Sequence, residues 1–494
     1  MESLSDTKWD VVISDTGLQH SLLALALSRS DKKVLHVDRN EYYGGNEAAF
    51  SLQEVDEWVE KVNGDVSKAF RNASIWKTAS EPSSEGSKLS FSRAYTLTLS
   101  PQIIYTKSKL LSQLVSSKVY RQLEFQAVGN WWIFDGEAGS ALKRLPNGRE
   151  DIFQDKTIDN RAKRSLMKFL KFVVDYENQV ETWQSHGDSG LAGFLSSQFQ
   201  LPPSLQTVIA ALTLSLDPPD TTKVKWALPR ISRHLSSLGV FGPGFGAVVP
   251  KWGGGAEISQ VACRAGAVGG GVYVLGTGVK TSVADAEDTE QRTQIHLSNG
   301  EIVTTEHLIE TCDASPADAK QVSKVIAVVS SPLSILFKTT VEGSPLAAVS
   351  VVVIPPHSLT IDWIPQPNPI YIMVHSSETG ECPNGQCVLY ATTSYLESGK
   401  ELLDKALSTF LKSIEEDAEL LYSLYYEQSQ SSKSTAASEP SDASLDLAFN
   451  DEILDEVEAQ WRQVVGDVDG AAFMRFEDRE GIDAYDDDEP SGEF

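Results

Sequence analysis

The chain lacks a long hydrophobic run, a leader pattern at its amino end and a cysteine at its carboxyl end. No stretch of about 18 uncharged apolar residues occurs in the 494-residue sequence, so we expect no membrane-spanning helix. Residues Met1 to Trp9 contain neither a basic segment nor an apolar core, which argues against a secretory signal peptide. The sequence ends at Phe494 without a cysteine to prenylate, so we expect no lipid anchor on the chain itself. Membrane contact is therefore expected to be peripheral or made through a partner.

Cysteine and positive charge are also scarce. The cysteines are scattered and have no histidine or cysteine pair that would complete a zinc site: Cys263, Cys312, Cys382 and Cys387. Reduced thiols of this kind are typical of a cytoplasmic protein. The 42 basic residues face 69 acidic residues, and the net charge of −27 disfavours a nucleic acid as partner. Residues 451–494 hold 16 acidic against 3 basic residues, so we interpret this end as a solvated tail.

A strand–turn–helix–strand pattern opens the sequence. Trp9–Ser14 is rich in β-formers, Leu18–Arg29 is an apolar helix candidate, and Lys33–Asp38 is a second apolar strand. Asp38 lies 21 residues after Gly17, where dinucleotide-binding folds place the carboxylate that binds the ribose. The pattern predicts an α/β domain of the FAD/NAD(P)-binding kind.

The turn between these elements departs from the glycine-rich phosphate motif. Its three key positions hold Asp15, Gly17 and His20, so only the middle glycine remains. A carboxylate at Asp15 would repel a phosphate, and His20 replaces a small residue that allows close helix packing. We therefore expect the βαβ scaffold to be kept for its packing without a bound cofactor. A FAD-dependent oxidoreductase of the amine-oxidase type stays open as an alternative.

The remaining sequence divides into three expected regions. Residues 1–149 and 236–426 alternate strands and helices and are assigned to one discontinuous α/β domain with mixed sheets. Residues 150–235 show helical periodicity and are assigned to an inserted helical domain. Residues 427–494 are assigned to a serine-rich linker and the acidic tail, with one further helix expected between Leu445 and Val465.

Three local expectations can be checked directly against a structure. Residues 71–95 are rich in serine, lysine and glutamate and are interpreted as a loop. Asn299-Gly300 between two β-rich runs predicts a hairpin with a type I′ turn. Leu403–Tyr426 has amphipathic periodicity and is interpreted as one helix.

Three longer motifs resemble the GDI/Rab escort superfamily. They are the strand and Tyr-Tyr-Gly-Gly turn of Lys33–Gly45, the segment Arg121–Val128 with its Arg-Gln-Leu-Glu-Phe start, and the glycine-rich stretch from Pro250 to Tyr273. The resemblance covers most of residues 8–426. It implies a GDI-like fold and a surface that binds GDP-bound Rab GTPases. Asp15, Asp31 and Glu41 depart from the family pattern, which has glycine, glycine and proline there.

The resemblance implies a Rab-binding platform at four positions. Tyr43 matches the family's switch-contacting tyrosine, Glu257 and Arg264 match its charged positions, and Val274 matches an apolar one. An aromatic anchor flanked by opposite charges is a sound basis for a binding hot spot. Without the resemblance, Glu257 and Arg264 would be interpreted as a structural ion pair within the domain.

The resemblance also separates the escort branch from the GDI branch. Phe153 and Arg164, eleven residues apart, match the positions by which escort proteins dock the α-subunit of Rab geranylgeranyltransferase. The alternatives are a hydrophobic staple for Phe153 and a solvated helix face for Arg164. The escort branch implies a non-catalytic chaperone that presents Rab to the transferase and shields the geranylgeranyl lipids, with transient membrane contact. A GDI, which extracts prenylated Rab without the transferase, is the main alternative.

Overall fold

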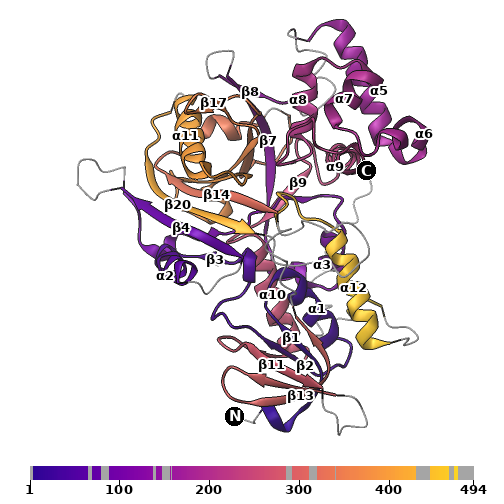
Figure 1. The fold of residues 1–494 in the computed structure, drawn as a ribbon, viewed down its shortest axis with the longest axis vertical. Helices are drawn as coiled ribbons and strands as arrows, with labels where there is room; N and C mark the ends of the chain where they lie inside the picture. Colours follow the sequence, from indigo (N-terminus) through magenta and orange to yellow (C-terminus); the bar gives the residue numbers. More distant parts are fainter. Residues whose placement is uncertain are drawn as a thin grey trace, which may run out of the picture.

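The computed structural model describes residues 4–64, 69–78, 88–136, 141–146, 156, 158–284, 292–310, 320–339, 341–414, 416–429, 445–466 and 472–476. Figure 1 shows an elongated molecule with a small sheet at one end, a large sheet in the middle and a helical module at the other end. Within this described part, no helix is both long enough and apolar enough to cross a bilayer.

The small sheet contains the predicted βαβ opening. Its strand order is β10-β2-β1-β13-β12-β11, and β1 pairs in parallel with β2 and β13. The bounds of the strands are β1 Lys8–Ser14, β2 Val34–Val37, β10 Val272–Val274, β11 Val279–Ala284, β12 Thr293–Leu297 and β13 Ile302–Ile309. All four residues of β2 are buried, which explains its uninterrupted apolar sequence.

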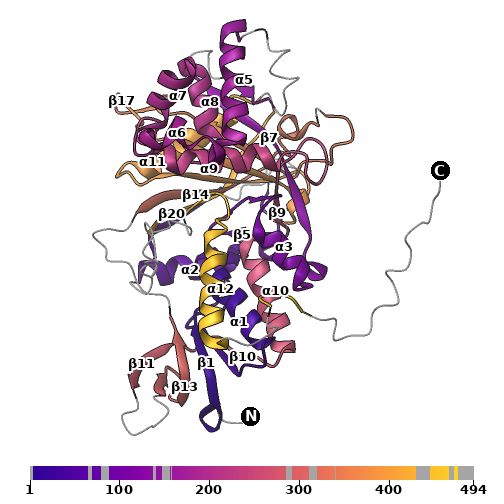
Figure 2. The same cartoon turned by 90° about the vertical axis from the view of Figure 1, so that its right-hand side faces the viewer.

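Helix α1 (Leu18–Ser28) is buried on almost every side, because two other helices cover it. It shares one hydrophobic core with α10 (Gly255–Val268) and α12 (Glu452–Val465). Figure 2 shows α12 lying beside α1 and α10, although these helices are far apart in the sequence. A helix buried all round needs no polar face. Helix α12 is thus part of the packed body, although its residues were assigned to the linker and acidic tail in the sequence analysis.

The large sheet runs in the order β4-β20-β14-β19-β18-β15-β7-β9-β6, with β8 paired to β7. Its strands are β4 Phe70–Lys77, β6 Ile104–Tyr105, β7 Phe125–Asp135, β8 Ala141–Arg144, β9 Ala247–Pro250, β14 Gln321–Val329, β15 Val349–Ile354, β18 Ile370–Ser376, β19 Cys387–Ser394 and β20 Leu420–Ser429. Helix α11 (Gly399–Lys412) packs on β14 and β19. Smaller elements complete the body: β3 Ala49–Phe50, β5 Leu97–Thr98, β16 Thr360–Ile361, β17 Ile364–Pro365, α2 Leu52–Asn63 and α3 Lys109–Ser116.

Two predictions of secondary structure were wrong. The single helix expected over Leu403–Tyr426 is the helix α11 followed by β20, which is buried on both faces and therefore has no alternating pattern. The loop expected over residues 71–95 contains β4, an edge strand with a register irregularity opposite Tyr425 and Glu427. Within β4 only Phe70 and Ala73 are buried, so the strand lacks the alternating apolar pattern of a half-buried strand.

The hairpin at Asn299-Gly300 was predicted correctly, but its turn differs. Strands β12 and β13 are antiparallel neighbours. The Gly300 N–H donates to the Leu297 carbonyl oxygen at 3.1 Å, and φ is +93° at Gly300. Asn299 is not among the residues with positive φ. A type I′ turn needs positive φ at both central residues, so this hairpin uses the longer turn with glycine at its last position.

The helical module forms a core of its own. It comprises α5 Asn160–Val174, α6 Val180–Trp183, α7 Leu191–Phe199, α8 Pro203–Ala211 and α9 Val224–Ser237. The apolar stripe of α5 predicted from the sequence points inward, and Leu166, Phe169 and Val173 are buried. Asp159 caps α5 by accepting the N–H groups of Arg161 and Ala162 at 2.7 and 3.0 Å.

Candidate functional site

The first turn of α1 is closed by acidic side chains rather than left open for an anion. Asp15 has φ of +88°, a left-handed conformation in which glycine is favoured. Its Oδ1 accepts the Gly17 N–H at 2.7 Å, and Glu47 Oε2 accepts the Leu18 N–H at 3.4 Å. These N–H groups are the donors that a helix start offers to a phosphate. Both are already bonded to carboxylates of the chain.

Asp38, the expected ribose ligand, is also bonded within the protein. Its Oδ2 accepts the Thr16 N–H at 2.8 Å and the Thr16 hydroxyl at 2.6 Å, and its Oδ1 accepts the Asn40 N–H at 2.8 Å. The residue is 1% exposed. Burial and the nearby Asp15 carboxylate raise the pKa of Asp38. The Asp38 oxygens therefore hold the turn after β1 and the loop after β2 in place.

These residues do not fit the pyrophosphate of FAD. Burial and the Asp15 carboxylate raise the pKa of Glu47 to about 7, which shows how poorly this place accepts negative charge. Space is also short, because a Cβ built on Gly45 would lie 2.6 Å from Asp15 Oδ1. A bound phosphate would find the Gly17 and Leu18 N–H groups already bonded, and it would face the carboxylates of Asp15 and Asp38. The βαβ unit therefore keeps the nucleotide-binding scaffold without a seat for the phosphates.

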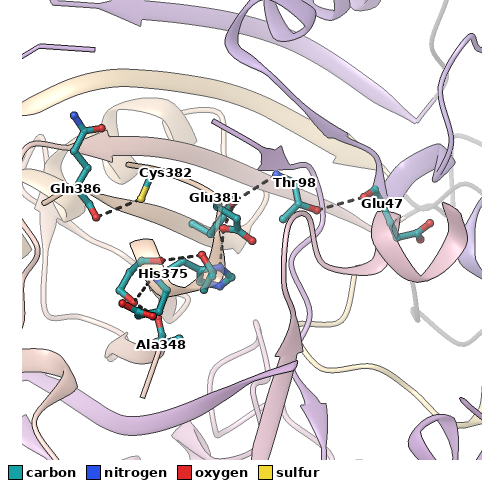
Figure 3. A network of polar contacts seen from close by, with 11 residues as sticks. Glu47, Thr98, Ala348, His375, Glu381, Cys382 and Gln386 are labelled. Atoms are coloured by element: carbon teal, nitrogen blue, oxygen red, sulfur yellow. Dashed lines mark hydrogen bonds and ion pairs between the residues drawn. The ribbon is translucent and has the colours of Figure 1, made fainter. Parts of the chain in front are cut away.

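A buried polar network links this turn to the large sheet. The Thr98 hydroxyl donates to the Glu47 carbonyl oxygen at 3.3 Å, and the Thr98 N–H donates to the Tyr390 hydroxyl at 3.3 Å. Tyr390 donates in turn to Glu381 Oε2 at 2.9 Å, and His375 Nδ1 lies 2.8 Å from the same oxygen. Figure 3 shows Glu47, Thr98 and Glu381 following one another across the interior, with His375 beside Glu381. No sequence motif predicts this network, because its members come from separate elements.

Helix α10 brings most of the predicted platform together. Glu257 is half-buried in its first turn, and Arg264 is exposed two turns later on the same side of the helix. Tyr43 lies near Arg264, since burial and the Cys263 thiol raise the pKa of Tyr43 while the Arg264 guanidinium lowers it. Among the described residues, Glu257 and Arg264 form no ion pair. The alternative of a structural salt bridge is therefore not what holds them.

Glycines allow the close approach of α10 to the Tyr43 loop. Gly253 and Gly254, before the helix, have φ of +128° and +62°. A Cβ on Gly253 would lie 2.8 Å from the Ala49 Cβ, and one on Gly44 would lie 3.2 Å from the Ala256 Cβ. Side chains at these positions would push the loop away from the helix. The motifs Tyr-Tyr-Gly-Gly and Trp-Gly-Gly-Gly thus meet in space.

Val274 does not join the other platform residues through its side chain. It is the last residue of β10, where neighbouring side chains point to opposite faces. Tyr273 packs with the core of α1 and α10, whereas Val274 packs with Val37 and Leu35 on the other face of the sheet. Gln260 is exposed between Glu257 and Arg264 on α10. It was not assigned to the platform, although the spacing Glu-x-x-Gln-x-x-x-Arg contains it.

Of the predicted transferase-binding residues, the structure describes one. Arg164 is exposed on α5, on the side away from the core of the helical module. Phe153 lies outside the described residues. That Phe153 and Arg164 lie close together therefore stays a prediction.

The two sheets, the inserted helical module and the closed phosphate turn define a GDI-like protein with an FAD/NAD(P)-binding-like fold. The family model of the GDP dissociation inhibitors (GDI) matches residues 5–471, and the chain belongs to this family. The crystal structure of Rab GDI from Plasmodium falciparum superimposes with a TM-score of 0.63 at 20% identity, covering 92% of this chain and 98% of that one.

Curated relatives carry two related names. The Saccharomyces cerevisiae protein "Rab proteins geranylgeranyltransferase component A" is 33% identical over 78% of this chain. The Arabidopsis thaliana "Rab escort protein 1" is 26% identical over 79% of this chain and 77% of its own length. The match spans 62% of the length of the yeast protein.

Proposed function

We propose that this chain is a Rab escort protein. In this role it binds GDP-bound Rab GTPases, presents them to Rab geranylgeranyltransferase and accompanies the prenylated product to membranes. It acts as an accessory subunit without a catalytic centre of its own, in the cytoplasm and with peripheral membrane contact. The net charge of −27 argues against a nucleic-acid partner.

The observation that carries the proposal is that Tyr43 lies near Arg264 on α10, with Glu257 two turns earlier on the same side of the helix. An aromatic ring grouped with a guanidinium and an acid offers both contact area and orientation to a partner. The names of the yeast and Arabidopsis relatives point to the same Rab pathway. Where the ancestral scaffold bound a nucleotide cofactor, this chain offers a surface to another protein.

Arg164 supports the choice of the escort role over a GDI role. Its guanidinium is exposed on a helix that carries many basic residues and no acid: Arg161, Lys163, Arg164, Lys168 and Lys171. A basic face of this kind suits an acidic partner surface in a chain that is otherwise strongly acidic. Phe153 is proposed as the apolar anchor beside it.

The deciding experiment is prenylation of a purified Rab by its transferase with and without this chain. The proposal expects lipid transfer only when the chain is present. Tyr43→Ala and Arg264→Ala should each weaken binding of GDP-loaded Rab by about 10–100-fold, because hot-spot truncations remove roughly 1.4–2.8 kcal/mol. Unchanged Rab affinity in both variants would contradict the platform.

The transferase surface has a separate test. Arg164→Ala should reduce capture of the transferase and leave binding of unprenylated Rab unchanged. Lys61→Ala, exposed on α2 and outside the helical module, serves as the control. Equal transferase capture by Arg164→Ala, together with a preference for prenylated over unprenylated Rab, would replace the escort role by the GDI role.

A further inference from the structure

A path of buried hydrogen bonds connects α10 to the loop after β2. The Cys263 thiol of α10 donates to Ser21 Oγ of α1 at 3.4 Å. The Ser21 hydroxyl donates to the Thr16 carbonyl oxygen at 2.9 Å, and the same carbonyl oxygen accepts the Gly44 N–H at 3.2 Å. The path therefore begins on α10 and ends at the residue that directly follows Tyr43.

Asp38 fixes the middle of this path. Its Oδ2 accepts the N–H and the hydroxyl of Thr16 at 2.8 and 2.6 Å, and Thr16 Oγ1 accepts the Gly44 N–H at 3.2 Å. The backbone of Asp38 adds the end of β10, because its N–H donates to the Val274 carbonyl oxygen at 3.0 Å and its carbonyl oxygen accepts the Thr277 N–H at 2.7 Å. Val274 thus takes part through its backbone, although its side chain packs on the other face of the sheet.

Water does not compete for these bonds, because the side chains that make them are buried. Asp38 and Thr16 are each 1% exposed, Cys263 is 2% exposed and Ser21 has none of its surface exposed. Burial raises the pKa of the Cys263 thiol to about 12, so this group keeps its proton and acts as a donor. A buried donor that loses its acceptor has no water to replace it, so each bond of the path favours one arrangement of the loop.

We propose that Asp38, Thr16 and Ser21 are positioning residues for the Rab-binding platform. They hold Tyr43 at a fixed place relative to Arg264. This inference rests on the proposed function, which makes Tyr43 and Arg264 contact residues. Asp38 stands where dinucleotide-binding folds have the carboxylate that binds the ribose, and in this chain it holds a loop of the partner-binding surface instead. A partner that needs both contact residues binds only the fraction of the chain in which both are in place, so its apparent affinity falls with that fraction.

The first test is the affinity of the full-length chain for purified GDP-loaded Rab. Thr16→Val keeps the shape of the side chain and removes its hydroxyl. It should weaken binding by roughly 10-fold, the size expected when a hydrogen bond to a charged group is lost. Thr16→Ser restores the hydroxyl and should bind like the parent chain. Ser28→Ala is the matched control, since Ser28 is buried on the same helix but donates to the Leu25 carbonyl oxygen, away from the path. An unchanged affinity in Thr16→Val would overturn the proposal.

A double-mutant cycle separates positioning from a general loss of structure. Thr16→Val should have no further effect on Rab affinity in a chain that already carries Tyr43→Ala, because the side chain to be positioned is gone. An equal loss of affinity in both backgrounds would contradict the positioning role. Ser21→Ala removes another bond of the path and should weaken binding in the same way, so it tests the proposal even if Thr16→Val does not fold.

Hydrogen exchange of the unbound chain keeps this inference apart from the proposed function. Residues 39–46 should exchange faster in Thr16→Val than in the parent chain, whereas α11, which lies outside the path, should not change. Unaltered exchange of residues 39–46 would overturn the restraint on the Tyr43 loop, even in a chain that binds Rab. Faster exchange in a chain that binds no GDP-loaded Rab would instead overturn the proposed function and leave the restraint in place.

Discussion

Single residues decide what the nucleotide-binding scaffold can hold. Asp15 and Asp31 both have positive φ, of 88° and 55°, at positions where the family pattern has glycine. Aspartate is one of the few residues with a side chain that tolerates this conformation. At Asp15 the carboxylate also bonds the start of α1, so the substitution fills the phosphate position with an anion of the protein's own.

Glu47 should make stability depend on pH. Its pKa is raised from an ordinary 4.5 to about 7, so between these values the folded chain keeps a proton that the unfolded chain has lost. Stability should therefore fall as pH rises from 4.5 to 7 and level off above 7, by on the order of 2–3 kcal/mol. Glu47→Gln should reduce this slope in chemical denaturation at stepped pH, and the raised pKa of Asp38 accounts for a remainder. Glu57→Gln, exposed on α2, should keep the full slope, and an unreduced slope in Glu47→Gln would contradict the assignment.

The sequence predicted only those parts of the site that lie within local motifs. The carboxylate at Asp15 is one of them. The assignment of Tyr43, Glu257 and Arg264 to a binding platform also comes from local motifs, and it stays a prediction. The second carboxylate, Glu47, could not be predicted, because it reaches α1 through the fold of the loop after β2. His375 and Glu381 were equally hidden, since neither belongs to a motif and they meet only after β18 turns back.

At the scale of elements, α12 completes a core that α1 and α10 leave open. Leu454, Val457 and Trp461 are buried against this core, and the Trp461 Nε1–H donates to Ser30 Oγ at 2.9 Å. The helix was predictable from its periodicity, but its place was not. A long serine-rich segment separates it from the preceding strand, and sequence spacing sets no contact across such a segment.

Trp461→Ala should destabilise the protein strongly. Removing this buried ring leaves a cavity and removes the hydrogen bond to Ser30 Oγ, which together cost about 3–5 kcal/mol. Arg462→Ala is the matched control, because Arg462 is exposed and its pair with Glu458 is a single turn apart on the surface. Urea denaturation should show a clear loss for the first variant and less than about 0.5 kcal/mol for the second. Equal effects would contradict the packing of α12 on α1.

The elements that misled prediction share one physical cause. β20 is buried on both faces, with Tyr425 in the core that α11 shares and Leu424 and Tyr426 in the core around Trp58, so its run Leu-Leu-Tyr-Ser-Leu-Tyr-Tyr has no period of two. Without that period, a buried strand after a helix cannot be distinguished from more helix. The clear cases, such as α5 and the hairpin β12–β13, have one polar side.

At the scale of the whole molecule, α9 ties the helical module to the body. Arg230 pairs with Asp446 at 3.2 Å, and its guanidinium stacks 3.7 Å from the centre of the Trp226 ring. The Arg233 guanidinium donates to the Phe449 carbonyl oxygen at 3.0 Å. Both bonds reach the segment just before α12. The module and α12 are therefore linked through this segment.

Asp446→Ala should loosen this link. The ion pair is only 22% and 18% exposed, and removing one partner leaves a partly buried guanidinium, so a loss of roughly 1–3 kcal/mol is expected. Hydrogen exchange should rise in α9 more than in the large sheet. Asp56→Ala breaks a pair with Lys77 that is about half exposed and should change stability by less than about 1 kcal/mol. Unaltered exchange in α9 would contradict the link.

The placement of α10 and α5 has a consequence for assembly. Both views show α5 at one end of the long axis, with the large sheet between it and α10 (Figures 1 and 2). Two partner proteins bound at these two helices would not compete for the same surface, and each would raise the local concentration of the other. The distance between the two helices would then set how far a flexible tail must extend from one partner to the other.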